Sequence, residues 1–208
     1  MKIGVIQAST QAGKNAFLFE TVKKHAADSE IINFGCGAEE KEQYSYIEIS
    51  LLAGLLLVSG TVDFIVTGCS SGQGMMLACN SFPGVLCGYA PTPMDAYLFA
   101  QINNGNAVSL PLGEGYTWAG YENCEQTIKS LFSEPFGQGY PKADAHRKQK
   151  DAALLKEIRA QSQTGLSEFL KRLDTQLVKK ILTKRDVIDC ILSNSSNACV
   201  REWITSIS

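Results

Sequence analysis

The sequence predicts an α/β fold in which a three-layer, Rossmann-like, doubly wound parallel sheet of five strands is followed by an all-helical C-terminal extension. Over the first 141 residues, short apolar runs alternate with helix-like segments, which is typical of a parallel sheet covered by helices on both faces. After a stretch rich in glycine and proline at residues 136–141, the chain becomes charged and helix-like. We therefore expect an α/β domain over residues 1–141 and a helical extension over residues 142–208 that packs on a partner subunit.

Five apolar runs bounded by turn signals are predicted to be strands. They span residues 2–7, 30–34, 62–66, 85–89 and 106–110. The predicted helices of this domain span residues 13–27, 43–59, 75–80 and 118–132, with a further helix that begins at Thr92-Pro93 and ends at Asn104-Gly105. Threonine followed by proline favours a helix start, because threonine caps the helix and proline suits its first position. In the extension we expect helices over residues 146–160, 165–184 and 186–207.

Composition indicates a globular, cytoplasmic protein without a membrane span. Hydrophobic residues make up 45% of the 208 residues, enough to fill a core. The longest apolar run, residues 49–58, is too short to cross a bilayer, and the N-terminus begins a strand rather than a signal peptide. The seven cysteines include no C-x-x-C pair, so we expect free thiols and no zinc site. We expect no metal, no other cofactor and no nucleic-acid partner.

Charge is distributed unevenly along the chain. Residues 1–141 contain six lysines and no arginine against thirteen acids, whereas residues 142–185 contain twelve basic residues against five acids. If the α/β domain binds an anion, any guanidinium group must come from the extension of its own subunit or of a partner. A solvated helix face is the alternative explanation for most of these basic residues.

The most informative stretch is residues 68–74, Gly-Cys-Ser-Ser-Gly-Gln-Gly, between a predicted strand and a predicted helix. A glycine-rich turn at a helix start directs several backbone N–H groups and the positive end of the helix dipole at one place, which suits a phosphate or an oxyanion. Cys69 lies in this turn, where the start of a helix favours the reactive thiolate form. The alternative is that Cys69 is a small core residue, which is the commoner role of buried cysteines.

Residues 68–74 and the following Ala-Cys-Asn-Ser-Phe-Pro-Gly at 78–84 resemble the signature of the type B ribose-5-phosphate isomerases and galactose-6-phosphate isomerases. Residues 101–106, Gln-Ile-Asn-Asn-Gly-Asn, and 136–139, Phe-Gly-Gln-Gly, are similar to two further motifs of that family. The resemblance covers about residues 1–160 in order and spacing.

The resemblance implies an aldose-ketose isomerase that moves a proton between adjacent carbons of an open-chain sugar phosphate through an enediolate. By this resemblance Cys69 is the base, and Ser71 occupies the position of a threonine that lies next to the catalytic cysteine in the family. It also implies that the substrate is bound by Thr10 and Gln11, by an anion hole formed by the backbone of Ser70, Gly72, Gln73 and Gly74, and by Asn103, Arg147 and Lys148. A homodimer is implied as well, because tail arginines of one subunit reach the phosphate in the other.

Four departures from the family pattern place the chain in a divergent branch. Thr10-Gln11 replaces an Asp-His pair after the first strand, and Ile102 occupies the position of the histidine that protonates the ring oxygen. Tyr140 occupies the position of a tail arginine, and Gly113 lies near the position of another arginine. Because isoleucine cannot donate a proton, we expect a substrate that needs no ring opening. A tetrose 4-phosphate fits, since its phosphate occupies the hydroxyl that would close a furanose ring.

Two other functional classes remain open at this stage. Residues 68–72 also fit G-x-S-x-G, the nucleophile elbow of α/β-hydrolases, with Ser70 as nucleophile. That triad needs a histidine beside the sheet, and His146 is the only histidine after Ser70. A non-catalytic sugar-phosphate binding protein is the third reading, because a fold alone does not fix function.

Overall fold

The computed structural model describes residues 1–207 and contains a five-stranded sheet in which all paired strands are parallel. The strand order is β2-β1-β3-β5-β4, with β1 at Lys2–Val5, β2 at Glu30–Asn33, β3 at Phe64–Cys69, β4 at Cys87–Tyr89 and β5 at Ala107–Pro111. The prediction of a doubly wound parallel sheet is therefore confirmed. Strand β3 runs farther than predicted, to Cys69, because its last residues pair with β5 in the register Thr67 with Ser109 and Cys69 with Pro111.

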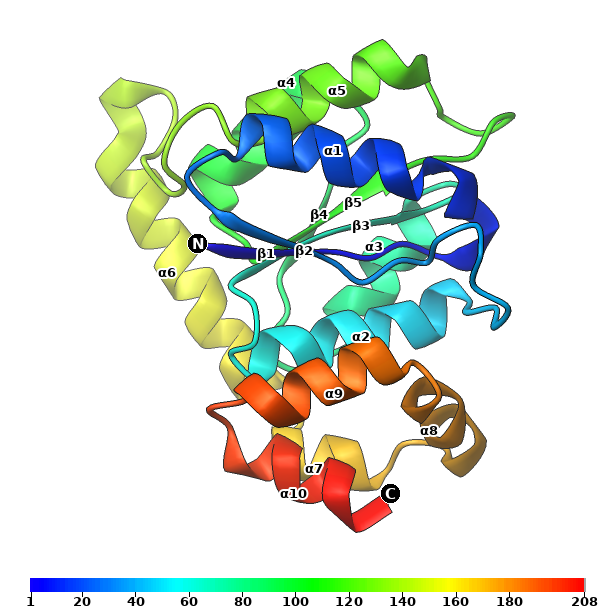
Figure 1. Ribbon diagram of the computed structural model, residues 1–208. Coiled ribbons are helices and arrows are strands. Elements are labelled where there is room, and N and C mark those ends of the chain that lie inside the picture. Colours follow the sequence, from blue (N-terminus) through cyan, green and yellow to red (C-terminus); the bar gives the residue numbers. More distant parts are fainter. Residues whose placement is uncertain (208) are drawn as a thin grey trace.

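Helices cover both faces of the sheet (Figure 1). On one face lie α1 at Asn15–His25, α4 at Pro93–Leu98 and α5 at Gly120–Leu131, and on the other lie α2 at Tyr46–Val58 and α3 at Gln73–Asn80. A separate apolar cluster fills each face, in keeping with the alternating apolar residues of β1 and β3. Short non-α segments extend two helices: the 3₁₀ helix η1, Ser9–Lys14, precedes α1, and the π-helix η2, Phe99–Asn103, follows α4.

The predicted helix starts are supported by side-chain caps. Thr92 accepts a hydrogen bond from the backbone N–H of Asp95 at 3.3 Å, with Pro93 in the first turn of α4. Ser45 and Glu48 form a capping box at the start of α2. These local contacts explain why helix positions in the α/β domain could be predicted from sequence.

The extension contains α6 at Ala145–Ser162, α7 at Leu166–Lys171, α8 at Thr175–Leu182, α9 at Arg185–Asn194 and α10 at Ala198–Ile207. The two long helices predicted over residues 165–184 and 186–207 are wrong, because each is divided. Asp174 caps α8 by accepting from the backbone N–H groups of Gln176 and Leu177 at 3.0 and 2.9 Å. Between α9 and α10, the backbone N–H of Ser196 and the side-chain amide of Asn197 donate to carbonyls at the end of α2, at 2.9 and 3.0 Å.

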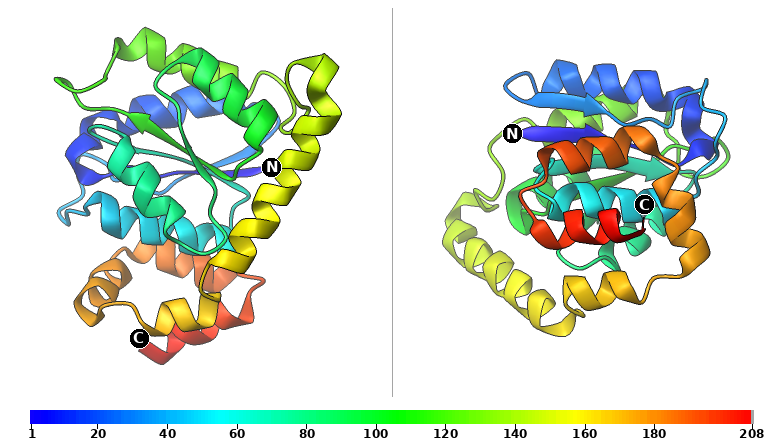
Figure 2. Two further views of the ribbon diagram at one scale, coloured as in Figure 1. Left: turned by 180° about the vertical axis from the view of Figure 1, so that it is seen from behind. Right: turned by 60° about the horizontal axis from the view of Figure 1, so that its bottom comes forward.

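Helices α8 and α9 pack on the outer face of α2 in their own chain, and α10 packs against α9 and α7, so that the extension forms a further layer below α2 (Figure 2). Every residue from 49 to 56 is buried, because α2 has the sheet on one side and the extension on the other. A helix that is apolar all round is a buried helix. Helix α6 differs: although all of it is described, it buries none of its residues, and Leu154, Leu155 and Ile158 are exposed. The predicted contact of the extension with a partner subunit therefore rests on α6. None of the helices within residues 1–207 is long and apolar enough to cross a membrane.

Candidate active site

The turn between β3 and α3 lies at the carboxyl ends of the strands, where parallel α/β sheets bind their ligands. Cys69 is the last residue of β3, and Gly72 caps α3 with a φ of +74°, a left-handed value that favours glycine. A Cβ atom at Gly72 would lie 2.8 Å from the backbone nitrogen of Pro111. The hydroxyl of Ser109 donates to the Gly72 carbonyl at 2.6 Å, so β5 fixes the turn from one side.

The segment after β5 fixes the same turn from a second side. The backbone N–H of Leu112 donates to the Cys69 carbonyl at 3.0 Å, and that of Gly113 donates to the Ser70 carbonyl at 2.9 Å. A Cβ atom at Gly113 would lie 2.7 Å from the Ser70 Cα atom. This close approach gives a physical reason why no arginine stands at Gly113.

Helix α3 supplies the oxyanion-binding character of the turn. The N–H groups of its first turn have no partner within the helix, as at every helix N-terminus. The first helical bond runs from Met76 N–H to the Gly72 carbonyl at 3.0 Å. Gln73 is exposed, whereas Gly74 and the serines of the turn are half-buried, and the Tyr46 ring lies 3.4 Å from where a Cβ atom of Gly74 would be. The turn therefore offers free N–H groups beside an aromatic ring.

The loop after β1 brings the predicted residue Gln11 to this turn. Its side-chain amide donates to the Ser70 hydroxyl oxygen at 3.0 Å, while neighbouring Thr10 is exposed. The backbone N–H of Ala8 donates to the Gly68 carbonyl at 3.0 Å, which ties the start of the loop to β3. Thr10, Gln11 and the Gly-rich turn thus lie at the same end of the sheet.

Lys14, at the end of η1, is a candidate site residue that the sequence analysis missed. It is only 8% exposed, its ammonium group lies 3.6 Å from Glu114, and it sits 4.6 Å from the centre of the Trp118 ring. The partner carboxylate is 80% exposed, so the ion pair opens toward solvent. The only available signal was a lysine directly after a loop expected at the carboxyl end of β1. Lys14 places a buried positive charge beside the loop that follows β5.

Asn103, Arg147 and Lys148 lie at the opposite end of the sheet. Asn103 is exposed and ends η2, four residues before β5 begins at Ala107. Helix α6 packs against η2 and runs along the side where β1 starts (Figure 1). Arg147 is exposed and pairs with Asp144 at 3.4 Å and with Asp151 at 3.3 Å. Cys69 is level with the far end of β5, so these residues are separated from it by at least the length of that strand, about 13 Å at about 3.3 Å per residue.

Four other thiols are held in their neutral form. Burial raises the pKa of Cys124 to about 12 and also raises the pKa of Cys36 and Cys190 above its usual range. The pKa of Cys87 is raised by its hydrogen bond with Cys79 and by burial. None of these thiols lies in the Gly-rich turn.

The two histidines do not approach Ser70. The His25 ring nitrogen lies 3.1 Å from the Glu125 carboxylate. His146 is exposed at the start of α6, at the end of the sheet opposite the turn. The chain has no other histidine. A serine-hydrolase triad on Ser70 therefore lacks its base within the chain. Within residues 1–207, no three His, Cys, Asp or Glu side chains are grouped as a metal site requires.

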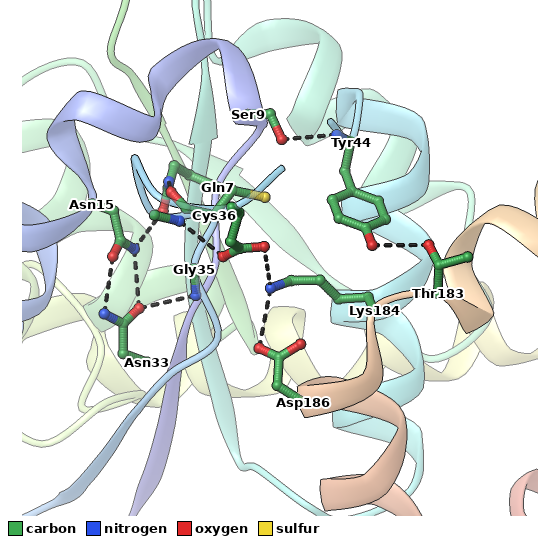
Figure 3. Close-up of polar contacts among 12 residues, drawn as sticks. Gln7, Ser9, Asn15, Asn33, Gly35, Cys36, Tyr44, Thr183, Lys184 and Asp186 are labelled. Carbon is green, nitrogen blue, oxygen red and sulfur yellow. Dashed lines mark hydrogen bonds and ion pairs between the residues drawn. The ribbon is translucent and has the colours of Figure 1, made fainter. Parts of the chain in front are cut away.

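A buried polar network supports the carboxyl ends of β1 and β2 (Figure 3). The Gln7 amide donates to the Cys36 carbonyl at 2.6 Å, and the Asn15 amide donates to Gln7 Oε1 at 2.9 Å. Asn15 also exchanges side-chain hydrogen bonds with Asn33. These contacts join two strand ends to the start of α1 and make this edge of the sheet a fixed support for the turn.

A family model described as Ribose/Galactose Isomerase matches residues 3–150, most of the α/β domain and the start of α6. The chain belongs to this family. No curated protein sequence matches the chain.

Two solved structures match over the full chain. A 4-deoxy-L-threo-5-hexosulose-uronate ketol-isomerase in complex with a tartrate is 38% identical, with a TM-score of 0.92, and covers 100% of this chain and 99% of its own. A ribose-5-phosphate isomerase from Vibrio parahaemolyticus is 36% identical over the same shares, also with a TM-score of 0.92. This chain is thus a sugar isomerase, an intramolecular oxidoreductase.

A more distant structure shows the fold alone. The type B ribose 5-phosphate isomerase from Trypanosoma cruzi is 21% identical, with a TM-score of 0.64. The match covers 77% of this chain and 99% of that chain. The helical extension is therefore shared with the two full-length matches, while the family model ends within α6.

Proposed function

We propose that this isomerase interconverts an aldose and a ketose of an open-chain, anionic sugar, with Cys69 as the base. The observation that carries the proposal is the position of Cys69, the last residue of β3, directly before the glycine-rich turn that starts α3. Within residues 1–207, no other cysteine, histidine or carboxylate combines this position at the carboxyl ends of the strands with adjacent free N–H groups.

In the proposed reaction, the Cys69 thiolate removes the proton from the carbon next to the aldehyde. The bond electrons form the carbon–carbon double bond of an enediolate, and the carbonyl oxygen becomes an oxyanion. The N–H groups of residues 70–74 stabilise that oxyanion, an effect for which each donor contributes about 2.7–4 kcal/mol. The Ser71 hydroxyl transfers a proton between the two oxygens, and Cys69 returns its proton to the former aldehyde carbon to give the ketose.

Two sources of positive charge serve the anionic end of the substrate. Lys14 is the buried cation at the carboxyl ends of the strands in the same chain. The cations Arg147 and Lys148, together with the neutral Asn103, come from a second subunit, because in their own chain they lie at the other end of the sheet. The active form is therefore a homodimer in which each site combines residues of both subunits.

Ile102 restricts the substrate to sugars that stay open. It is half-buried in η2, next to Asn103, and has no proton to give to a ring oxygen. A tetrose 4-phosphate meets this requirement because it cannot close a furanose ring. Ribose 5-phosphate, which exists largely as rings, does not.

A hexosulose uronate is a second candidate, favoured by the 38% identical ketol-isomerase structure. In a 4-deoxy-5-hexosulose uronate, carbon 4 has no hydroxyl and carbon 5 is a ketone. Neither of the hydroxyls that close an aldose ring onto carbon 1 is present, so no acid is needed to open a ring at the aldehyde carbon. Its carboxylate carries less charge than a phosphate, which agrees with the absence of arginine from residues 1–141.

The deciding experiment is proton NMR in deuterated water with erythrose 4-phosphate, ribose 5-phosphate and 4-deoxy-L-threo-5-hexosulose uronate, with Cys69→Ala as the background control. We expect deuterium to enter one of the two open-chain sugars at the carbon next to the carbonyl. A tenfold preference in kcat/KM for the pentose, equal to about 1.4 kcal/mol, would exclude the open-chain substrate. If the sugars bind but none of the three exchanges a proton, the proposed role of Cys69 as a catalytic base is excluded.

A further inference from the structure

The C-terminal part of α8 and the linker that follows it surround the side chain of Tyr44, which belongs to the loop before α2 (Figure 3). Tyr44 is 2% exposed, and its hydroxyl lies 2.9 Å from the Thr183 hydroxyl oxygen. Because the Thr183 hydroxyl already donates to the Lys180 carbonyl at 2.7 Å, Tyr44 is the donor of this bond. The ammonium groups of Lys180 and Lys184 lie 4.8 and 5.9 Å from the centre of the Tyr44 ring.

The backbone of Tyr44 in turn holds the first residue of η1. Tyr44 N–H donates to the Ser9 hydroxyl oxygen at 2.7 Å, and Ser9 N–H donates to the Tyr44 carbonyl at 3.0 Å. Two residues farther along η1, Gln11 donates to Ser70 in the turn beside Cys69 at 3.0 Å. Hydrogen bonds between Thr183 and Tyr44, between Tyr44 and Ser9, and between Gln11 and Ser70 therefore connect residue 183 to the turn, with the η1 backbone joining Ser9 to Gln11.

A second link joins the same two segments. The Lys184 ammonium group, in a side chain that is 4% exposed, contacts Glu40 at 2.6 Å and Asp186 at 3.1 Å. Glu40 also accepts from the backbone N–H of Gly37 at 2.9 Å, so the ion pair fixes the loop that follows β2.

Apolar packing also attaches the extension to the α/β domain. Apolar side chains from α7 to α10 are buried in the cluster that includes α2, among them Leu170, Ile181, Ile188 and Val200. The polar contacts of residues 180–184 are instead directed at the loop of residues 35–45. That loop borders the β1 loop and the turn.

We propose that residues 180–184 position the catalytic turn, acting through Tyr44, Ser9 and Gln11. The helical extension is then a part of the active-site support rather than only a cover for α2. Thr183 and Tyr44 are positioning residues, since they touch neither the turn nor a reacting atom. This inference rests on the proposed function, because it takes the turn as the site of the chemistry. Small displacements of a catalytic group lower the rate steeply, so a loss of this support should appear mainly in kcat.

The test compares Thr183→Val, which removes the hydroxyl at nearly constant shape, with Thr183→Ser, which keeps it. We expect Thr183→Val and Tyr44→Phe each to lower kcat about threefold to thirtyfold with little change in KM. Thr183→Ser should restore kcat, and the Tyr44→Phe/Thr183→Val double variant should be no worse than either single one. The matched control is Thr205→Val in α10, whose exposed hydroxyl bonds only to the Arg201 carbonyl at 2.9 Å. Equal kcat values for Thr183→Val, Thr183→Ser and Thr205→Val would overturn the proposal.

Amide hydrogen exchange gives a readout that does not depend on activity. We expect Thr183→Val to raise exchange in residues 9–14 and 70–74 but not in β5, and Tyr44→Phe provides the same test if Thr183→Val does not fold. Raised exchange with unchanged kcat would overturn the positioning role. If the wild-type protein turned over none of the test sugars, the proposed function would fail. Separately, unchanged amide exchange at residues 70–74 in Thr183→Val would overturn the link from residues 180–184 to the turn.

Discussion

The two ends of the sheet carry different halves of the predicted site. At the carboxyl ends of the strands lie the thiol and free N–H groups of the turn, with Lys14 as a buried cation. At the amino ends lie Asn103 and the first basic residues of α6. In a parallel sheet these ends cannot approach each other within one chain. Under the proposed function, the proton-transfer groups and the arginine are therefore apart in one chain, and a complete site would need a second copy.

The largest effect is expected from Cys69→Ala at the carboxyl end. Removing a positioned base should lower kcat by about a hundredfold to ten-thousandfold, while circular dichroism and substrate binding stay unchanged. Cys199→Ala is the matched control, because Cys199 is a half-buried thiol in α10, away from the turn. Activity within tenfold of wild type in Cys69→Ala would assign the base to another residue.

The next largest effect is expected from Arg147→Ala at the amino end. A lost hydrogen bond to a charged group costs about 1.5–3 kcal/mol, so KM should rise by about tenfold to a hundredfold. Arg172→Ala is the control, since Arg172, directly after α7, forms a similar exposed ion pair with Glu168, four residues earlier. Equal KM values in the two variants would remove Arg147 from the site.

Mixed dimers separate the two-subunit arrangement from one within a single chain. Cys69→Ala and Arg147→Ala subunits, unfolded together and refolded, should form mixed dimers in which one of the two sites is intact. Random pairing then gives about a quarter of wild-type activity. No activity above that of the separate variants, or a fully active monomer in solution, would contradict the shared site.

A smaller effect, on stability, is expected from Lys184→Met. Glu40 and Asp186 are part-exposed and can be hydrated once the lysine is gone, so the loss should be about 1–2 kcal/mol, below that of a fully buried pair. Lys180→Met should cost less than about 1 kcal/mol, because its partner Glu42 is 60% exposed. Urea unfolding of the three proteins measures both values, and a larger loss in Lys180→Met would contradict this ranking.

The Lys184 contribution should also depend on pH. Burial alone would lower the pKa of Lys184, but the hydrogen bond to Glu40 and the charge of Asp186 outweigh it and raise the pKa above its ordinary value. A raised lysine pKa gives stabilisation that is complete below the unfolded pKa of about 10.4 and is lost as pH rises through the folded pKa. The stability difference between wild type and Lys184→Met should therefore be constant from pH 7 to about pH 10 and shrink above it.

The smallest effect is expected from Ile102→His. If the substrate is open, an added acid has no ring to protonate, and kcat/KM should change by less than about threefold, or about 0.7 kcal/mol. Ile102→Gln controls for the loss of an apolar side chain. A gain in ribose 5-phosphate turnover with histidine but not with glutamine would show that the missing acid limits a cyclic substrate.

Much of this architecture could be predicted from sequence because its signals are local. Alternating apolar and helical segments gave the parallel sheet, Thr92-Pro93 gave the start of α4, and the small residues at 68–74 gave the turn. The breaks at residues 172–174 and 195–197 could not be predicted from periodicity, because the second depends on contacts with the end of α2, more than a hundred residues earlier.

The same limit applies to the site. Lys14 is buried only because Glu114 and Trp118, a hundred residues away, lie beside it. The role of Gln11 was suggested by family resemblance, whereas its bond to Ser70 depends on tertiary structure. One signal was present but not used. The apolar run of residues 49–58, interrupted only by Ser50 and Gly54, has no polar face and so indicates that α2 is covered on its outer face as well as its inner one.

That double cover of α2 has a consequence for the order in which the chain is made. Synthesis proceeds from the N-terminus, so α2 emerges more than a hundred residues before α7–α10, which cover its outer face. Throughout that interval the nascent chain carries an apolar helix surface with nothing to shield it, and such surfaces promote aggregation. The helices after residue 165 thus act as a shield that is supplied late, and until they are made the outer face of α2 is a surface on which chaperones could bind.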